Sequence, residues 1–206
     1  MGNHPSSPKS SQAPELDAAM HRYAKGEDSA FAELYSGLAP RLQVFLRRVC
    51  GKQDLAEDLA QETLLRIHRA RGSFAPQAAV VPWAYAIARN CYIDHMRGLK
   101  ARIKLATPTD AGGEPVVPEP IAGIEASAEQ EQIARQTAEV IERELQRMTM
   151  ARREAFVLLR YEGLSVVEAA HVLGATPSAV KLRAFHAYEA IRKALAEMEP
   201  TSEEES

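Results

Sequence analysis

The stretch SVVEAAHVLGATPSAVKLRAFHA, which spans residues 165–187, decides the fold class of this chain. Its opening Ser165-Val-Val-Glu168 has the spacing of a capping box, in which the serine and glutamate side chains accept hydrogen bonds from each other's free backbone amides at the start of a helix. Gly174 fits the end of that short helix. Thr176-Pro177 then fits the cap and the first position of a second helix. Two capped helices joined by a short turn with a glycine predict a helix-turn-helix.

The second helix of this motif has two different faces when it is projected at about 100° per residue. Its inner face is apolar and consists of Val180, Ala184, Ala187, Ile191 and Leu195. A helix-turn-helix that binds DNA brings residues near the N-terminus of its second helix to the base edges. The residues that we predict to contact DNA are Thr176, Ser178, Ala179, Lys181, Leu182, Arg183, Phe185 and His186. The alternative interpretation is a plain helical hairpin inside a bundle.

Two apolar side chains, Leu182 and Phe185, stand on the outer face beside the cations Lys181 and Arg183. Neighbouring apolar side chains among cations indicate a contact surface. They would touch either thymine methyl groups or a protein that covers this face.

A segment rich in proline and glycine separates two helical blocks. Four prolines and three glycines fall between residues 107 and 123, a composition that stops helices and strands alike, and no lysine or arginine occurs between Leu105 and Ala134. The segment therefore predicts an acidic, flexible tether. Apolar residues recur at helical spacing in both blocks, which predicts an all-α fold of two small domains. The predicted parts are a disordered tail (1–14), a first domain (15–105), the linker (106–127), a second domain (128–197) and an acidic tail (198–206).

A predicted helix at about residues 53–69 has an apolar face and a mixed face. The apolar face carries Leu55, Ala56, Leu59, Thr63, Ile67 and Ala70. The mixed face carries acidic and polar groups together with Leu64 and Leu65, a composition typical of a protein-docking patch. The alternative is that the first domain buries this helix on both sides.

The next predicted helix begins near Val81-Pro82 and runs to at least Arg97. If it continues through Gly98, one face carries four cations, Arg89, Arg97, Lys100 and Lys104. Phe74, Trp83 and Tyr85 are nearby, and cations with aromatic rings suit a single DNA strand, because charge follows the backbone while rings stack on unpaired bases. The aromatic residues could equally belong to the core. Asp94 precedes Arg97 by three residues and could orient it through an intrahelical ion pair.

Composition restricts the remaining function classes. The net charge is −3, so any DNA contact must come from local basic patches. The two cysteines, Cys50 and Cys91, are predicted to be reduced, and the six histidines lack metal-ligand spacing. We predict no metal, cofactor or small-molecule substrate, no membrane insertion and a cytoplasmic protein, since the chain has neither a membrane-spanning run nor a signal-peptide pattern. The acidic pairs Glu57-Asp58 and Glu203-Glu204 are adjacent residues rather than converging carboxylates, which argues against an enzyme.

Two long stretches resemble one known family. DLAEDLAQETLLRIHRA (54–70) followed by PWAYAIARNCYIDHMRG (82–98) resembles the region-two domain of extracytoplasmic-function sigma factors. REAFVLLRYEGLSVVEAAHVLGATPSAVKLRAFHA (153–187) resembles their region-four domain. The resemblance covers about residues 15–104 and 128–197, in the order of that family. It implies a factor that binds core RNA polymerase and directs promoter recognition, DNA melting and transcription initiation.

The resemblance also implies roles for residues. The surface that would bind core polymerase is Asp54, Glu57, Asp58, Gln61, Glu62, Leu64 and Leu65. The residues that would open and read the minus-ten element are Phe74, Trp83, Tyr85, Arg89, Asn90, Asp94, Arg97 and Lys100. The helix-turn-helix residues named above would read the minus-thirty-five element, and the linker would pass through the polymerase cleft. An anti-sigma factor is the further partner that the resemblance implies.

The chain departs from the family at the upstream reader. Leu182 stands where serine is usual, and His186 and Tyr188 stand where arginines are usual. These departures should weaken attraction to the DNA backbone and alter promoter choice. The rival interpretation is a stand-alone helix-turn-helix regulator acting as a dimer, although the sequence shows neither an effector domain nor dimerisation heptads.

Overall fold

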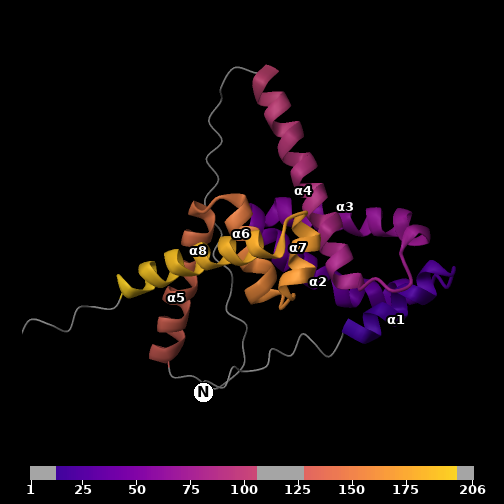
Figure 1. Cartoon of the computed structure of the whole chain (residues 1–206), viewed down its shortest axis with the longest axis horizontal. Helices are drawn as coiled ribbons and strands as arrows, with labels where there is room; N and C mark the ends of the chain where they lie inside the picture. The colour runs from indigo at the N-terminus through magenta and orange to yellow at the C-terminus, as the bar shows by residue number, and fades with distance from the viewer. Residues whose placement is uncertain (1–12, 106–127, 199–206) are drawn as a thin grey trace, which may run out of the picture.

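The computed structural model describes residues 13–105 and 128–198 of the chain (Figure 1). Within these two ranges all regular structure is helical, which confirms the all-α prediction. The first domain contains α1 (Ala13–Ala24), α2 (Ala30–Cys50), α3 (Gln53–Ala70), the 3₁₀ turn η2 (Arg71–Ser73) and α4 (Val80–Leu105). The second contains α5 (Ala128–Arg147), α6 (Met150–Phe156), the π-helical turn η3 (Val157–Tyr161), α7 (Val166–Leu173) and α8 (Pro177–Ala196). The predicted linker and both predicted tails lie outside the described residues, apart from a few at their edges.

The first domain is a bundle built around α2. This helix contributes a continuous buried stripe that includes Leu34, Leu38 and Phe45, because apolar residues three and four apart share one face. Helix α1 lies close to α2 at Gly37, where a Cβ atom would stand 2.4 Å from Cδ2 of Leu16. Glycine at this position therefore permits the close packing of α1 on α2.

The second domain contains the predicted helix-turn-helix. The backbone N–H of Ser165 donates to Glu168 Oε2 (2.8 Å), and the N–H of Glu168 donates to Ser165 Oγ (3.2 Å), so the capping box is confirmed. Helix α7 ends at Gly174 in the left-handed region (φ 57°). Thr176 Oγ1 then accepts a hydrogen bond from the N–H of Ala179 and begins α8. The caps thus fix where α7 stops and α8 starts.

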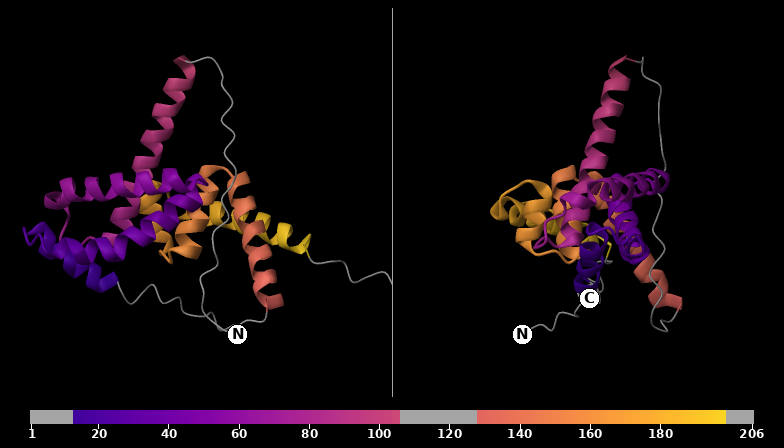
Figure 2. Two further views of the ribbon diagram at one scale, coloured as in Figure 1. Left: turned by 180° about the vertical axis from the view of Figure 1, so that it is seen from behind. Right: turned by 90° about the vertical axis from the view of Figure 1, so that its right-hand side faces the viewer.

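The two domains pack directly against each other, with α4 against α7 and the C-terminal end of α2 against α5 and η3 (Figures 1 and 2). The Gln146 amide donates to the carbonyl oxygen of Arg48 (3.1 Å), and the Arg48 guanidinium lies 3.8 Å from the centre of the Tyr161 ring. Buried Arg153 donates to the carbonyl oxygens of Val49 in α2 and of Leu145 at the end of α5. A single guanidinium therefore satisfies carbonyl groups at the ends of two helices that belong to different domains.

The C-terminal end of α4 projects away from both domains (Figures 1 and 2). Residues 97–101 are all exposed, whereas much of the N-terminal half of α4 is buried. A helix end of this kind is open to a binding partner from several directions.

Candidate nucleic-acid and protein interfaces

The mixed face of α3 presents most of the predicted docking residues to solvent. Asp54, Glu57, Asp58, Gln61 and Leu65 are exposed, and Glu62 is half-buried. Leu65 is 51% exposed, so about half of this apolar side chain is available to a partner. In this set of six side chains one apolar group, Leu65, is surrounded by carboxylates and an amide, and we call the six residues the α3 patch.

Leu64 corrects the prediction for this face, because it is buried and only 7% exposed. It follows Ala60 by four residues and precedes Ile67 by three, and both of these are buried, so Leu64 lies on the stripe of α3 that faces the core. Leu64 therefore packs within the domain and does not belong to the α3 patch.

Arg66 connects the α3 patch to α4, a link that sequence reasoning missed. Its Nε lies 2.8 Å from Glu62 Oε1 and its Nη1 lies 2.9 Å from Asp94 Oδ2. Hydrogen bonds to Asp94 and Glu62 raise the pKa of Arg66 above its usual value. The predicted partner of Asp94, Arg97, lies farther from it at 3.9 Å. Asp94 is thus held mainly by Arg66 of the neighbouring helix α3, which precedes it by 28 residues in the sequence.

The exposed half of α4 carries Asn90, Asp94, Arg97 and Lys100, all of which reach solvent. The predicted aromatic residues behave differently. Phe74 is buried and packs edge to face against half-buried Trp83, with ring centroids 5.0 Å apart. The start of α4 is fixed beside this pair, because the N–H of Val80 donates to Asp17 Oδ1 (2.7 Å).

Tyr85 and Arg89, which the sequence placed among the DNA-reading residues, lie in the contact between the domains. The Tyr85 side chain is 1% exposed and its hydroxyl donates to Glu162. Arg89 Nε lies 3.1 Å from Oε1 of Glu154, a carboxylate that is itself 1% exposed. In this arrangement neither side chain is free to contact DNA.

Burial changes the protonation chemistry of this contact. Desolvation raises the pKa of Glu154, although Arg89 opposes the shift, with a smaller contribution from Arg183. Burial, together with the Glu162 carboxylate, raises the pKa of Tyr85 well above its usual value. Sequence reasoning missed both glutamates. The available signal was a charged pair, Arg153-Glu154, immediately before an apolar run.

The outer face of α8 presents the predicted upstream readers. Thr176, Ser178, Lys181, Leu182, Phe185 and His186 are exposed, and Ala179 and Arg183 are half-buried. Leu182 and Phe185 are each 57% exposed, and so is Tyr188, which was absent from the predicted set. Three large apolar or aromatic side chains on one exposed helix face indicate a surface that another molecule covers.

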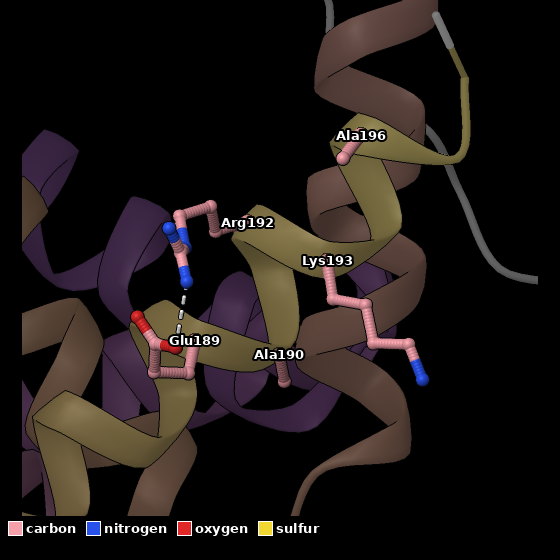
Figure 3. Close-up of a pocket in the computed structure, with 5 residues that line it drawn as sticks. All are labelled: Glu189, Ala190, Arg192, Lys193 and Ala196. Carbon is pink, nitrogen blue, oxygen red and sulfur yellow. Dashed lines mark hydrogen bonds and ion pairs between the residues drawn. The ribbon is translucent and has the colours of Figure 1, made fainter. Parts of the chain in front are cut away.

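A shallow pocket lies farther along α8 (Figure 3). It is lined by Glu189, Ala190, Arg192, Lys193 and Ala196, and Arg192 Nη2 lies 3.0 Å from Glu189 Oε2. All five residues come from one helix, and the ion pair is exposed, so the pocket lacks the enclosed, converging groups of a catalytic site. Within residues 13–105 and 128–198, no group of three or more histidine, cysteine, aspartate or glutamate side chains could hold a metal ion. None of the described helices is long and apolar enough to span a bilayer.

Family models match both domains of the chain. The family model for sigma-70 region 2 matches residues 34–102, and that for sigma-70 region 4 matches residues 138–191. The chain is 33% identical over 186 residues to the RNA polymerase sigma factor CarQ of Myxococcus xanthus, a match that covers 87% of this chain and 97% of CarQ. It is 31% identical over 161 residues to the ECF RNA polymerase sigma factor SigM of Mycobacterium tuberculosis, covering 78% and 74% of the two chains.

Solved structures share the fold. The sigma factor RpoE of Bartonella quintana, crystallised with the anti-sigma factor NepR, superposes with a TM-score of 0.66 at 23% identity, covering 81% of this chain and 96% of RpoE. CnrH, solved with the cytosolic domain of CnrY, superposes with a TM-score of 0.61 at 23% identity, covering 88% and 97% of the two chains.

The chain therefore belongs to the sigma-70 family of RNA polymerase sigma factors, which are transcription initiation factors rather than enzymes. Within that family it is a sigma factor of the extracytoplasmic-function type, so the first domain corresponds to region 2 and the second to region 4.

Proposed function

We propose that this protein binds core RNA polymerase through the α3 patch and directs it to promoters through α4 and α8. The observation that carries the proposal is the exposure of three separate faces of matching chemistry in a chain with both sigma regions: the α3 patch, the polar end of α4 and the N-terminal half of α8. The chain itself carries out no chemistry. It acts in the cytoplasm, where the polymerase it would bind transcribes DNA.

The α3 patch supplies the polymerase contact. An exposed leucine within a ring of polar and acidic groups is the usual composition of a protein interface, with an apolar centre and a polar rim. Leu65 would be the central contact, and Asp58 and Glu57 would pair with cations of the partner. Glu62 takes part through Arg66, which it holds in place.

Helix α4 supplies the minus-ten contact. Arg97 and Lys100, both exposed, would follow the phosphates of a separated strand, while exposed Asn90 would contact the bases. Asp94 would hold a fixed orientation there because Arg66 binds it from α3. Trp83 is half-buried and would offer one ring edge to an unpaired base.

Helix α8 supplies the minus-thirty-five contact. Its N-terminal half would enter the major groove, with Lys181 on phosphate and Arg183 near the base edges. Leu182 and Phe185 would contact thymine methyl groups there. An anti-sigma factor, of the kind that binds RpoE in the solved complex, would cover the same apolar side chains when the factor is inactive. The predicted linker would pass through the polymerase cleft.

The polymerase contact is tested by binding to core RNA polymerase and by run-off transcription. Leu65→Arg and Asp58→Arg should each weaken binding and transcription together. Val167→Arg is the control, since Val167 is 70% exposed on α7, a helix of the second domain, and it should bind normally. Normal binding by both α3 variants would remove the proposed docking surface.

A second measurement, binding to promoter DNA without polymerase, separates the rival function. A stand-alone regulator would bind its DNA site tightly without polymerase, whereas a sigma factor needs core enzyme for specific binding. Arg183→Ala should lower initiation at the cognate promoter much more than it lowers polymerase binding.

A further inference from the structure

Helix α1 carries none of the residues to which the proposed function gives a role, yet it lies along the loop between η2 and the start of α4 (Figure 1). Residues 75–79 of this loop are exposed or half-buried, and a buried residue closes it at each end, Phe74 before it and Val80 after it. Both ends meet α1. The ring centroid of Phe74 lies 5.7 Å from that of His21, and the N–H of Val80 donates to Asp17 Oδ1 (2.7 Å).

The hydrogen bond from Val80 to Asp17 is an N-cap that another helix supplies. The first N–H groups of a helix have no partner within it, and a side-chain oxygen of the residue just before the helix usually satisfies one of them. Ala79, which precedes α4, has no such oxygen, and the acceptor comes instead from α1, 63 residues earlier in the sequence. A carboxylate at this position also interacts favourably with the positive end of the helix dipole. Asp17 therefore fixes the start of α4 against α1.

The position of Trp83 depends on this face of α1. Trp83 lies in the first turn of α4, where its N–H donates to the carbonyl oxygen of Ala79 (3.4 Å). Its ring packs edge to face on Phe74, and Phe74 in turn packs on His21. Asp17 and His21 are four residues apart, so they share one face of α1. This face holds Trp83 by its backbone through Asp17, and by its ring through His21 and Phe74.

On the basis of the proposed function, in which Trp83 meets an unpaired base, we propose that α1 is the platform that holds the minus-ten reader in place and that Asp17 is its positioning residue. Asp17 does not contact DNA. It keeps the first turn of α4, and with it the Trp83 ring, in the position on which a base stacks. A ring that is already fixed loses little conformational freedom when the base binds, so binding is tighter.

The first measurement uses the fluorescence of Trp83, which is the only tryptophan in the chain. Acrylamide quenching is measured on the full-length chain without polymerase. Asp17→Ala should raise the quenching constant about twofold, because the half-buried ring gains access to solvent when the first turn of α4 frays. Glu15→Ala is the matched control, since it removes an exposed carboxylate from the start of the same helix, and it should quench like wild type.

The second measurement is the affinity of the assembled holoenzyme for a single-stranded oligonucleotide that carries the minus-ten element of a cognate promoter. Asp17→Ala should bind it about fivefold more weakly, the factor that corresponds to one N-cap interaction. Binding to core polymerase, and to duplex DNA with only the minus-thirty-five element, should not change. Asp17→Asn should lose less affinity, since its amide oxygen accepts the same hydrogen bond without the charge.

A double-mutant comparison separates positioning from general destabilisation. If Asp17 acts through Trp83, Asp17→Ala should have little further effect on oligonucleotide binding in a chain that already carries Trp83→Ala. Equal losses in the two backgrounds would overturn the proposal. Far-ultraviolet circular dichroism identifies a variant that loses helix. In that event Asp17→Leu replaces Asp17→Ala, because leucine has nearly the shape of aspartate and favours a helix but offers no acceptor oxygen.

The outcomes are distinct. Unchanged quenching, or unchanged oligonucleotide binding, by a folded Asp17 variant would overturn the positioning role while leaving the proposed function intact. A wild-type holoenzyme that binds the oligonucleotide no better than core polymerase alone would overturn the proposed function, and with it the part of α1 in reading DNA. Greater quenching and weaker oligonucleotide binding, with no further loss in the Trp83→Ala background, would support both.

Discussion

At Glu154 a carboxylate lies almost completely buried beside the guanidinium of Arg89, and its burial raises its pKa above the ordinary value of 4.5. The folded state therefore binds more protons than the unfolded state between pH 4.5 and the raised pKa. This extra proton binding stabilises the folded state. Its contribution to the free energy of unfolding is fully present below the ordinary pKa and is lost as the pH rises through the raised pKa. We predict that wild type gains stability relative to Glu154→Gln as the pH falls from neutral toward the ordinary carboxyl pKa of 4.5. Urea unfolding across this range measures it. A constant difference between the two proteins would contradict the burial argument, and Glu142, whose pKa is also raised by burial, cancels because both proteins contain it.

Adjacent leucines on α3 offer a second prediction at this scale. Leu64→Ala should reduce the free energy of unfolding by about 2–5 kcal/mol, because it leaves a cavity in the core. Leu65→Ala should change it by less than about 0.5 kcal/mol, because this side chain is half exposed. Only Leu65→Ala should weaken polymerase binding without loss of stability. Equal destabilisation by both substitutions, measured by urea unfolding, would mean that Leu65 is also a core residue.

At the level of single elements, the N-caps of two helices in the second domain form a matched pair. Ser165 accepts a hydrogen bond from the backbone of Glu168, whereas Thr149, at the start of α6, makes no side-chain cap bond. Ser165→Ala should therefore cost about 1 kcal/mol of stability, and Thr149→Ala much less. Chemical denaturation of both variants measures the difference. Similar losses would show that the cap of α7 is not what stabilises the helix-turn-helix.

The same elements show how far the sequence predicts the structure. The helix-turn-helix follows from local signals, since Ser165, Gly174 and Thr176 act within a few residues of themselves. The α3 patch was predictable except for Leu64. Leu64 lies near the edge of the buried stripe of α3, where the rotation of about 100° from one residue to the next separates buried Leu64 from exposed Leu65. The Arg66–Asp94 pair was missed because a helical wheel compares residues only along one helix.

For the whole molecule, the contact between the domains was the part that the sequence did not predict. It depends on Arg89 meeting Glu154, 65 residues away, and no local pattern encodes that distance. The expectation that Tyr85 faces DNA came from its residue type. In this structure the Tyr85 side chain is buried between the two domains instead.

The net charge of −3 leads to a prediction for the free chain. Without polymerase the protein should bind promoter DNA weakly and lose that binding steeply as salt rises, because local cations alone contact the phosphates. With core polymerase the DNA contacts become effectively intramolecular, so specific binding should persist at salt concentrations that abolish promoter binding by the free chain. Fluorescence anisotropy with a labelled promoter fragment measures both. Tight, salt-resistant binding by the free chain would favour the stand-alone regulator.

The projecting end of α4 has a consequence for handling the purified protein. Residues 97–101, which we call the stalk, are all exposed and include Arg97 and Lys100. Because no tertiary packing holds the stalk, only its backbone hydrogen bonds resist local fraying. Trypsin should therefore cut the stalk early, after Arg97 or Lys100, and separate the first domain from the second. Any ligand that binds the stalk would delay the cut, so the rate at which the intact band disappears from a gel reports occupancy without a label.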